Sequence, residues 1–174
     1  MPIKNPKQVF VLMLSDLRRG TEKTTSIFQN LAQLAEDPDI KQALEVRTFI
    51  SQKVVETLDQ CFKLIGEQPV PLSGTRTRIY DVLAEDFRTE VADIQDTKTR
   101  RFYILAKLNN LVHLRAAEYK TLIAAADISG NYGVAVLLET CLADKLALAE
   151  RTQKLLRSIA EPEMAERIAV KRVA

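Results

Sequence analysis

The chain has little of what interrupts helices and little of what builds catalytic sites. Its 174 residues include five glycines, six prolines and no tryptophan, so long uninterrupted helices are expected. His113 is the single histidine, and with Val112, Leu114 and Arg115 around it no nucleophile–base–acid set can be built. The two cysteines have no metal-type spacing and are predicted to be small buried thiols, Cys61 and Cys141.

Charge of neither sign dominates. The 25 basic and 23 acidic residues leave a net charge of +2, which argues against a nucleic-acid or acidic-lipid partner. The opening "MPIKNPKQVFVLML" has too short an apolar run for a signal peptide or a membrane span. We therefore expect a cytoplasmic protein with reduced thiols and no membrane partner.

Apolar residues recur at spacings of three and four, and no stretch alternates as a strand would. Short turns join the first two and the last two long segments, so each pair is expected to pack antiparallel. The prediction is a single all-α domain, 1–174: a four-helix bundle of two antiparallel helical hairpins, with a short helix in the crossover. Long helices are expected at about 6–35, 38–66, 97–128 and 132–160, a short helix at about 76–92, and a frayed tail at 161–174.

Three stretches resemble the YciE/YciF family of bacterial ferritin-like proteins: "PIKNPKQVFVLMLSDLRRGTEK", "VHLRAAEYKTLIAAA" and "AVLLETCLADK". The resemblance covers about residues 3–160 and makes the chain look like a divergent member. It implies a ferritin-like bundle, commonly dimeric, with a poorly defined stress-related role. In some relatives the bundle holds a two-metal carboxylate site.

A di-metal site of the ferritin type needs a carboxylate from each of two helices and a Glu-x-x-His from each of the other two. This chain has no Glu-x-x-His, and Asn110 stands three positions before its one histidine. Counting outward from the two turns, at about 1.5 Å per residue, identifies one axial level, and the resemblance places the family's ligands there. Its occupants are Glu22, Phe49, Gln52, Val112, Arg115, Leu142 and Lys145.

One acid beside two cations opposes metal binding, because metal ligands must be anionic or neutral. The sequence therefore predicts a former metal site, with no metal, no cofactor and no catalysis. Two arrangements stay open for Glu22: an internal pair with Arg115, Lys145 or both, completed by Gln52, or a surface position with the cations reaching solvent. His113 is predicted to be a structural residue that points about 100° away from its sequence neighbours.

Three function classes follow. The expected one is a non-catalytic structural or interaction protein, dimeric through an apolar strip on the outer faces of the first two long helices, with an unknown protein partner. The second is a ferritin-type oxidase or ferroxidase with an irregular site, formed by Glu22, Glu139, Asp144 and His113. The third is a Dps-like DNA-associating bundle using the basic loop and tail. Ligand count opposes the second class. Charge balance opposes the third and makes the basic runs "TRTR" (75–78) and "KTRR" (98–101) solvated faces.

Overall fold

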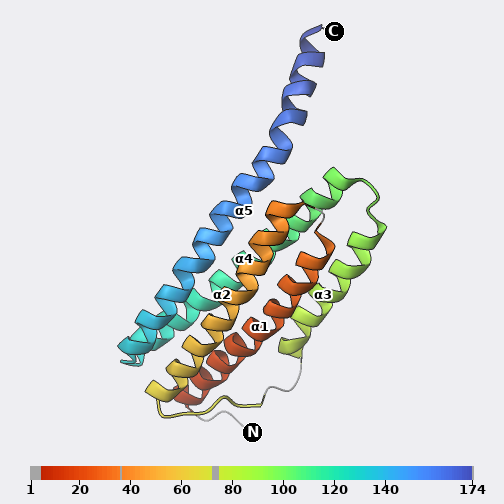
Figure 1. Cartoon of the computed structure of the whole chain (residues 1–174). Helices are drawn as coiled ribbons and strands as arrows, with labels where there is room; N and C mark the ends of the chain where they lie inside the picture. The colour runs from red at the N-terminus through yellow and green to blue at the C-terminus, as the bar shows by residue number, and fades with distance from the viewer. Residues whose placement is uncertain (1–4, 36, 72–74, 174) are drawn as a thin grey trace.

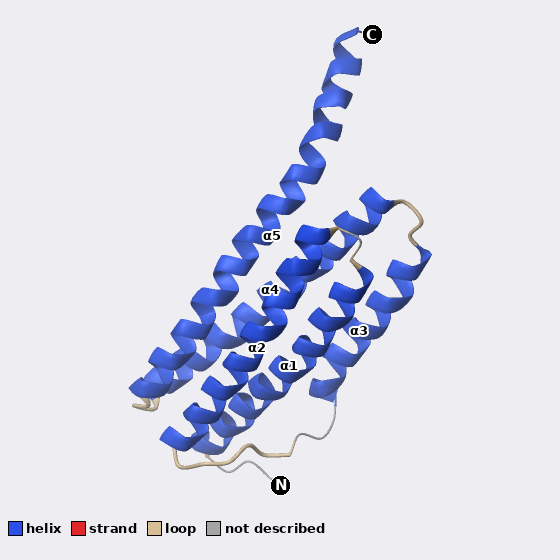
Figure 2. Ribbon diagram, in the orientation of Figure 1, coloured by secondary structure: helices blue, strands red, loops and turns tan. Residues whose placement is uncertain are grey.

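The computed structural model describes residues 5–35, 37–71 and 75–173, with side chains up to 159 apart from 75–77. Every regular element in these ranges is a helix (Figure 2). In chain order they are α1 (Pro6–Leu34), α2 (Pro38–Leu64), α3 (Thr75–Asp93), α4 (Thr97–Ile128) and α5 (Tyr132–Val173).

Helix starts follow local sequence signals. Asn5 caps α1 by accepting a hydrogen bond from the Gln8 backbone N–H at 2.9 Å, and Asp37 caps α2 in the same way. Asp96 caps α4 through the Thr99 N–H at 2.7 Å. Two of these helices have proline in the first turn, where its missing N–H is not needed. Gly130, with φ of +71°, lies in the turn after α4.

The helices form two antiparallel hairpins, α1–α2 and α4–α5, packed side by side (Figure 1). Helix α3 runs along α1 and α4 in the crossover between the hairpins. This arrangement confirms the predicted fold class, a ferritin-like four-helix bundle with a short additional helix. None of the described helices has the length and apolarity together that crossing a membrane would need.

The prediction that the last helix ends near residue 160 is wrong, because α5 continues to Val173. Helix α5 has 42 residues against 32 in α4, and its last turns extend past the other helices (Figure 1). Pro162 suggested a stop, but strong helix formers surround it in the sequence "IAEPEMAER". A proline disfavours one turn of a helix without preventing its neighbours from continuing it.

The apolar core is divided into two clusters by a polar layer. One cluster includes Phe28, Leu44, Leu105, Val112 and Leu148, and lies toward the end of the bundle where α1 meets α2. The other lies toward the opposite end and includes Leu17, Leu58, Leu122, Leu138 and Cys141. Between them, every long helix turns one or more polar side chains inward: Thr21, Thr24, Arg47, Ser51, Arg115 and Lys145.

Candidate functional site: a cationic layer inside the bundle

The polar layer buries three cations from three helices. Arg115 of α4 is 2% exposed, Lys145 of α5 is 3% exposed and Arg47 of α2 is 9% exposed. Helix α1 contributes only hydroxyl groups, from Thr21 and Thr24. Cations this deep in a protein normally require compensating anions or hydrogen bonds. The polar layer, with its three buried cations, is therefore the candidate functional site of this fold.

Arg115 is the well-compensated cation. Its Nη2 donates to the Leu17 carbonyl oxygen at 2.7 Å and to Thr21 Oγ1 at 2.6 Å. Its Nη1 donates to the Tyr80 hydroxyl at 2.9 Å and forms an ion pair with Glu118, three residues along the same helix. The guanidinium therefore connects α4 to α1 and to the crossover helix α3.

Tyr80 completes this arrangement from α3. Its hydroxyl accepts from Arg115 and donates to Glu118 Oε1 at 2.6 Å, so the three side chains form a closed network. Gly20 of α1 makes room for it. A Cβ added at Gly20 would overlap Arg115 Nη1 and lie 2.9 Å from the Tyr80 ring. The absent side chain at this position lets the two polar groups approach the α1 backbone.

The network also sets the protonation states of its members. Burial lowers the pKa of the Arg115 guanidinium, but the charge of Glu118 and the two nearby tyrosines outweigh that effect and raise the pKa overall. Burial raises the pKa of Tyr80 to about 12, despite the opposing charge of Arg115. Arg115 is thus charged and Tyr80 neutral throughout the physiological range.

The other side of the layer, between α2 and α5, lacks such compensation. Arg47 Nη2 donates to the Asp144 carbonyl oxygen at 2.9 Å, while its buried Nη1 has no hydrogen-bond partner. Ser51, one turn further along α2, is fully buried and its Oγ has no partner either. Lys145 makes no hydrogen bond or ion pair with any part of the chain that the structure describes.

The lack of compensating partners changes the pKa values of Lys145 and Arg47. Burial, followed by the charges of Arg115 and Arg47, lowers the pKa of Lys145 to about 8. Burial is also the largest cause that lowers the pKa of Arg47, which the Asp144 carboxylate only partly offsets. An arginine stays protonated regardless, so Arg47 keeps its charge while Lys145 can lose its own slightly above neutral pH.

Glu22 does not enter the layer, and the hypothesis that it pairs internally with Arg115 or Lys145 is wrong. Its carboxylate, about one-third exposed, pairs with Arg18 at 2.6 Å and with Arg19 at 3.2 Å. Both partners lie on α1 itself. The acid that compensates Arg115 is Glu118 instead.

The other residues of the predicted axial level are buried or partly buried on the α4–α5 hairpin and exposed on α2. On α4 and α5, Val112, Arg115 and Lys145 are buried and Leu142 is partly buried. On α2, Phe49 is 61% exposed and Gln52 is exposed, so Gln52 does not complete an internal pair. Counting from the turns estimated height along the bundle but not rotation about each helix axis. One position along α1 or α2, about 100° of rotation, separates Glu22 from buried Thr21 and Gln52 from buried Ser51.

The remaining sequence candidates lie apart from one another. His113 is exposed, although its neighbour Val112 is buried, and its Nε2 lies 3.4 Å from the Gln153 amide nitrogen of α5. Glu139 and Asp144 are exposed on α5. Both cysteines are free and buried, and burial raises their thiol pKa values, to about 12 for Cys61 and about 11 for Cys141. These thiols are unreactive at neutral pH.

The sequence analysis did not identify six residues in or beside the layer, among them the hydroxyl residues Thr21 and Thr24 of α1. Arg47 and Ser51 lie one turn apart on the buried stripe of α2, and their phase relative to Leu44 and Leu58 was a usable signal. Glu118 could be suspected from its spacing of three residues from Arg115. Tyr80 carried no comparable signal, because only the docking of α3 brings it to the layer.

A ferritin-like fold suggests a pair of metal ions at the middle of the bundle, so the donor set there can be tested. Three cations and several hydroxyls face inward at this level, and the half-buried Glu118 is already engaged by Arg115 and Tyr80. Among the described residues, no group of three or more histidine, cysteine, aspartate or glutamate side chains could hold a metal ion. Divalent metals need several anionic or neutral donors, so these residues do not fit a di-metal centre.

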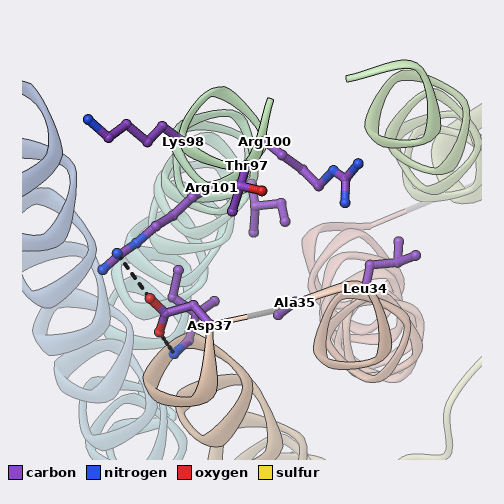
Figure 3. A pocket seen from close by; sticks show the side chains of 9 residues that line it. Leu34, Ala35, Asp37, Thr97, Lys98, Arg100 and Arg101 are labelled. Carbon is purple, nitrogen blue, oxygen red and sulfur yellow. Dashed lines mark hydrogen bonds and ion pairs between the residues drawn. The ribbon is translucent and has the colours of Figure 1, made fainter. Parts of the chain in front are cut away.

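Two surface pockets lie away from the layer, each of about 210 Å³. One, between α1, α3 and α4, is lined mainly by apolar side chains such as Ile27, Leu83 and Phe87. The other is where the α1–α2 turn meets the start of α4 (Figure 3). In it Arg101 pairs with Asp37 at 3.0 Å, and Arg100 donates to the Ile94 carbonyl oxygen. Both arginines of the basic run 98–101 thus make structural contacts, while Lys98 extends into solvent (Figure 3).

Two helical hairpins, a crossover helix and an interior polar layer define the class of this protein as a ferritin-like bundle. The chain belongs to the DUF892 family, a domain of unknown function whose model matches residues 5–169. No match to this chain is found among curated proteins.

Solved structures share the fold of this chain. YcfI of Rhodopseudomonas palustris, provisionally described as a structural protein, is 26% identical, with a TM-score of 0.79 over 87% of this chain and 94% of that one. The Escherichia coli stress protein YciF is 21% identical, with a TM-score of 0.81 over 91% and 99%. A ferritin-like diiron-carboxylate protein from Bacillus anthracis is 15% identical, with a TM-score of 0.66 over 88% and 99%. The last two share the fold only.

Proposed function

We propose that this protein is a non-catalytic ferritin-like bundle with a structural or interaction role. The observation that carries the proposal is the occupancy of the polar layer, where Arg47, Arg115 and Lys145 are buried and Glu118 pairs with one of them. A positive interior repels divalent metal, and among the described residues no group of three or more acidic, histidine or cysteine side chains could hold it. The provisional structural role of YcfI agrees with this proposal.

Metal loading tests the proposal directly. The full chain is purified without chelators, and its iron, manganese and zinc contents are measured before and after incubation with each metal. Oxidation of ferrous iron is followed in parallel, with a known ferritin as positive control. We expect substoichiometric metal and oxidation at the rate of buffer. Stoichiometric iron, or oxidation above the buffer rate, would overturn the proposal.

We also propose that the protein is a homodimer. On the outer face of α2, Val46 and Phe49 are 52% and 61% exposed and lie one turn apart. In a two-fold contact each side chain meets the same surface of a second copy, which doubles the apolar area removed from water. The outer strip expected on α1 has less support, because Val9 and Leu34 are exposed only near its two ends.

Light scattering coupled to size exclusion measures the oligomer. We expect the mass of a dimer for the native chain and of a monomer for Phe49→Lys. The matched control is Ile128→Lys, which changes another exposed apolar residue at the far end of α4 and should leave the dimer intact. A monomeric native chain, or an intact Phe49→Lys dimer, would contradict this interface.

A stress-related role in the cytoplasm is the last part of the proposal. It rests on the description of YciF as a stress protein and on two buried, free cysteines, which suit a reducing compartment. We propose no nucleic-acid or membrane partner, because the net charge is only +2. Loss of the gene should reduce survival under at least one osmotic, oxidative or envelope stress, and equal survival under all of them would contradict the role.

A further inference from the structure

The α2–α5 side of the polar layer contains hydrogen-bond donors that nothing in the described chain accepts from. Arg47 Nη1 is buried and unpaired, although Nη2 of the same guanidinium is bound to the Asp144 carbonyl oxygen. Lys145 is only 3% exposed, and it forms no hydrogen bond or ion pair with any of the described residues. Two buried cations with spare donors are a large unfavourable contribution unless an anion meets them.

Ser51 gives independent evidence of a missing partner. Buried serines and threonines in helices usually donate to a backbone carbonyl of the preceding turn. Ser15, Thr21, Thr24 and Thr152 all do so, with O···O distances between 2.7 and 3.0 Å. Among the buried serines and threonines that the structure describes, Ser51 alone makes no such bond, although it is 0% exposed. Its hydroxyl is available to donate to something else.

The three groups lie in one part of the bundle. The bond from Arg47 to the Asp144 carbonyl ties α2 to α5 directly beside Lys145. Ser51 follows Arg47 by four residues and therefore shares its face of α2. Both α2 residues point inward between the two apolar clusters, as Lys145 does on α5. No carboxylate of the described chain forms an ion pair with either cation.

We propose that Arg47, Ser51 and Lys145 form a binding site for a small monovalent inorganic anion of the size of chloride. Guanidinium, hydroxyl and ammonium groups each donate a hydrogen bond to the ion. A monovalent ion is favoured over phosphate or sulfate, because entry into a site this deep requires the anion to shed its water. The proposal of an anion site rests on these three residues alone and does not depend on the structural role proposed above.

Thermal unfolding at constant ionic strength tests the site. The native chain is melted in sodium chloride and in sodium gluconate, whose anion is too large to enter the packed interior. We expect chloride to raise the midpoint by about 3–5 °C relative to gluconate, since an anion that binds only the folded state stabilises it. The difference should disappear in Lys145→Met and shrink in the near-isosteric Ser51→Ala.

The matched control is Lys53→Met, which removes the same charge from the surface of α2, where Lys53 pairs with Glu56. This variant should keep the full chloride effect. Equal midpoints in the two salts, or the same chloride effect in Lys145→Met as in the native chain, would overturn the site. Stabilisation by phosphate but not by chloride would overturn the assignment to a monovalent ion.

Crystals grown with bromide in place of chloride locate the ion. An anomalous-scattering peak is expected among Arg47 Nη1, Ser51 Oγ and Lys145 Nζ in the native chain and in Lys53→Met, but not in Lys145→Met. A native map without a peak at this position would overturn the proposal. Metal analysis is a separate measurement, so failure of the anion site and failure of the non-catalytic role can be distinguished.

Discussion

Arg115, on the α1–α3–α4 side of the polar layer, donates four hydrogen bonds and pairs with Glu118, whereas Lys145, on the α2–α5 side, has no partner among the described residues. Both side chains are nearly inaccessible to solvent. The pKa of Arg115 is raised because its partners outweigh the effect of burial. The pKa of Lys145 is lowered because burial and the charges of Arg115 and Arg47 all disfavour its charged form. Burial of a charge therefore has opposite consequences on the two sides, depending on what surrounds it.

Replacement of Arg115 by methionine should have the largest effect. It removes four hydrogen bonds and leaves Glu118 without its cation, so we expect the free energy of unfolding to fall by about 3 kcal/mol. Urea denaturation measures this loss. Arg88→Met is the control, because it breaks an exposed pair with Glu85 on α3. A loss below about 1 kcal/mol for Arg115→Met would show that the network contributes little net stability.

Replacement of Lys145 by methionine should act in the opposite direction. The pKa of Lys145 is about 8 in the folded protein against an ordinary 10.5, so its charged form destabilises the fold below pH 8 by about 3 kcal/mol. In chloride-free buffer at pH 7, Lys145→Met should therefore be more stable by about 2–3 kcal/mol.

This advantage should shrink between pH 8 and 10.5, because in that window the unfolded native chain binds more protons than the folded one and native stability rises with pH. The groups around Lys145 are Arg47 of α2, Arg115 of α4, and Cys141 and Asp144 of α5. The raised thiol pKa values lower stability above pH 9, and the charge of Lys145 acts on the Cys141 thiol, so the comparison between pH 8 and 9 is the one that isolates Lys145. A pH-independent difference would contradict the assignment.

Gly20→Ala should disturb the compensated side by steric overlap. The new Cβ would meet Arg115 Nη1 and the Tyr80 ring, which are held by their own hydrogen bonds, so we expect a loss of about 2 kcal/mol. Gly133→Ala in α5 is the control, since its nearest neighbour would be Leu64 Cδ1 at 3.6 Å. Thermal melts of the two variants should differ clearly. Equal midpoints would mean that Arg115 and Tyr80 move aside at little cost.

Glu22→Gln should have the smallest effect. Glu22 pairs only with Arg18 and Arg19 at the surface, where such pairs contribute little, so we expect a change below about 0.5 kcal/mol. Glu118→Gln is the informative comparison, because it removes the charge that Arg115 faces. If Glu22→Gln proved as destabilising as Glu118→Gln in urea, the carboxylate would have to lie inside the layer after all.

Local signals in the sequence were enough for much of the fold. Asn5, Asp37 and Asp96 are capping residues that start helices, and the apolar spacing between them is helical. The same signals could not place the end of α5, because Pro162 and the helix formers around it point in opposite directions. For the layer, the sequence indicated unusual basic residues at Arg115 and Lys145 but selected the wrong acid for them.

By itself, the sequence determined the number of helices, their pairing into hairpins and the axial level of Arg115 and Lys145, because these follow from periodicity and from counting residues at a fixed rise. Only the tertiary structure decided which side of α1 and α2 faces inward, and so placed Thr21 and Ser51 in the layer instead of Glu22 and Gln52. It also brought Tyr80 to Arg115 through the docking of α3. Rotation about a helix axis and contacts across a crossover depend on how whole apolar faces pack, and no local pattern encodes them.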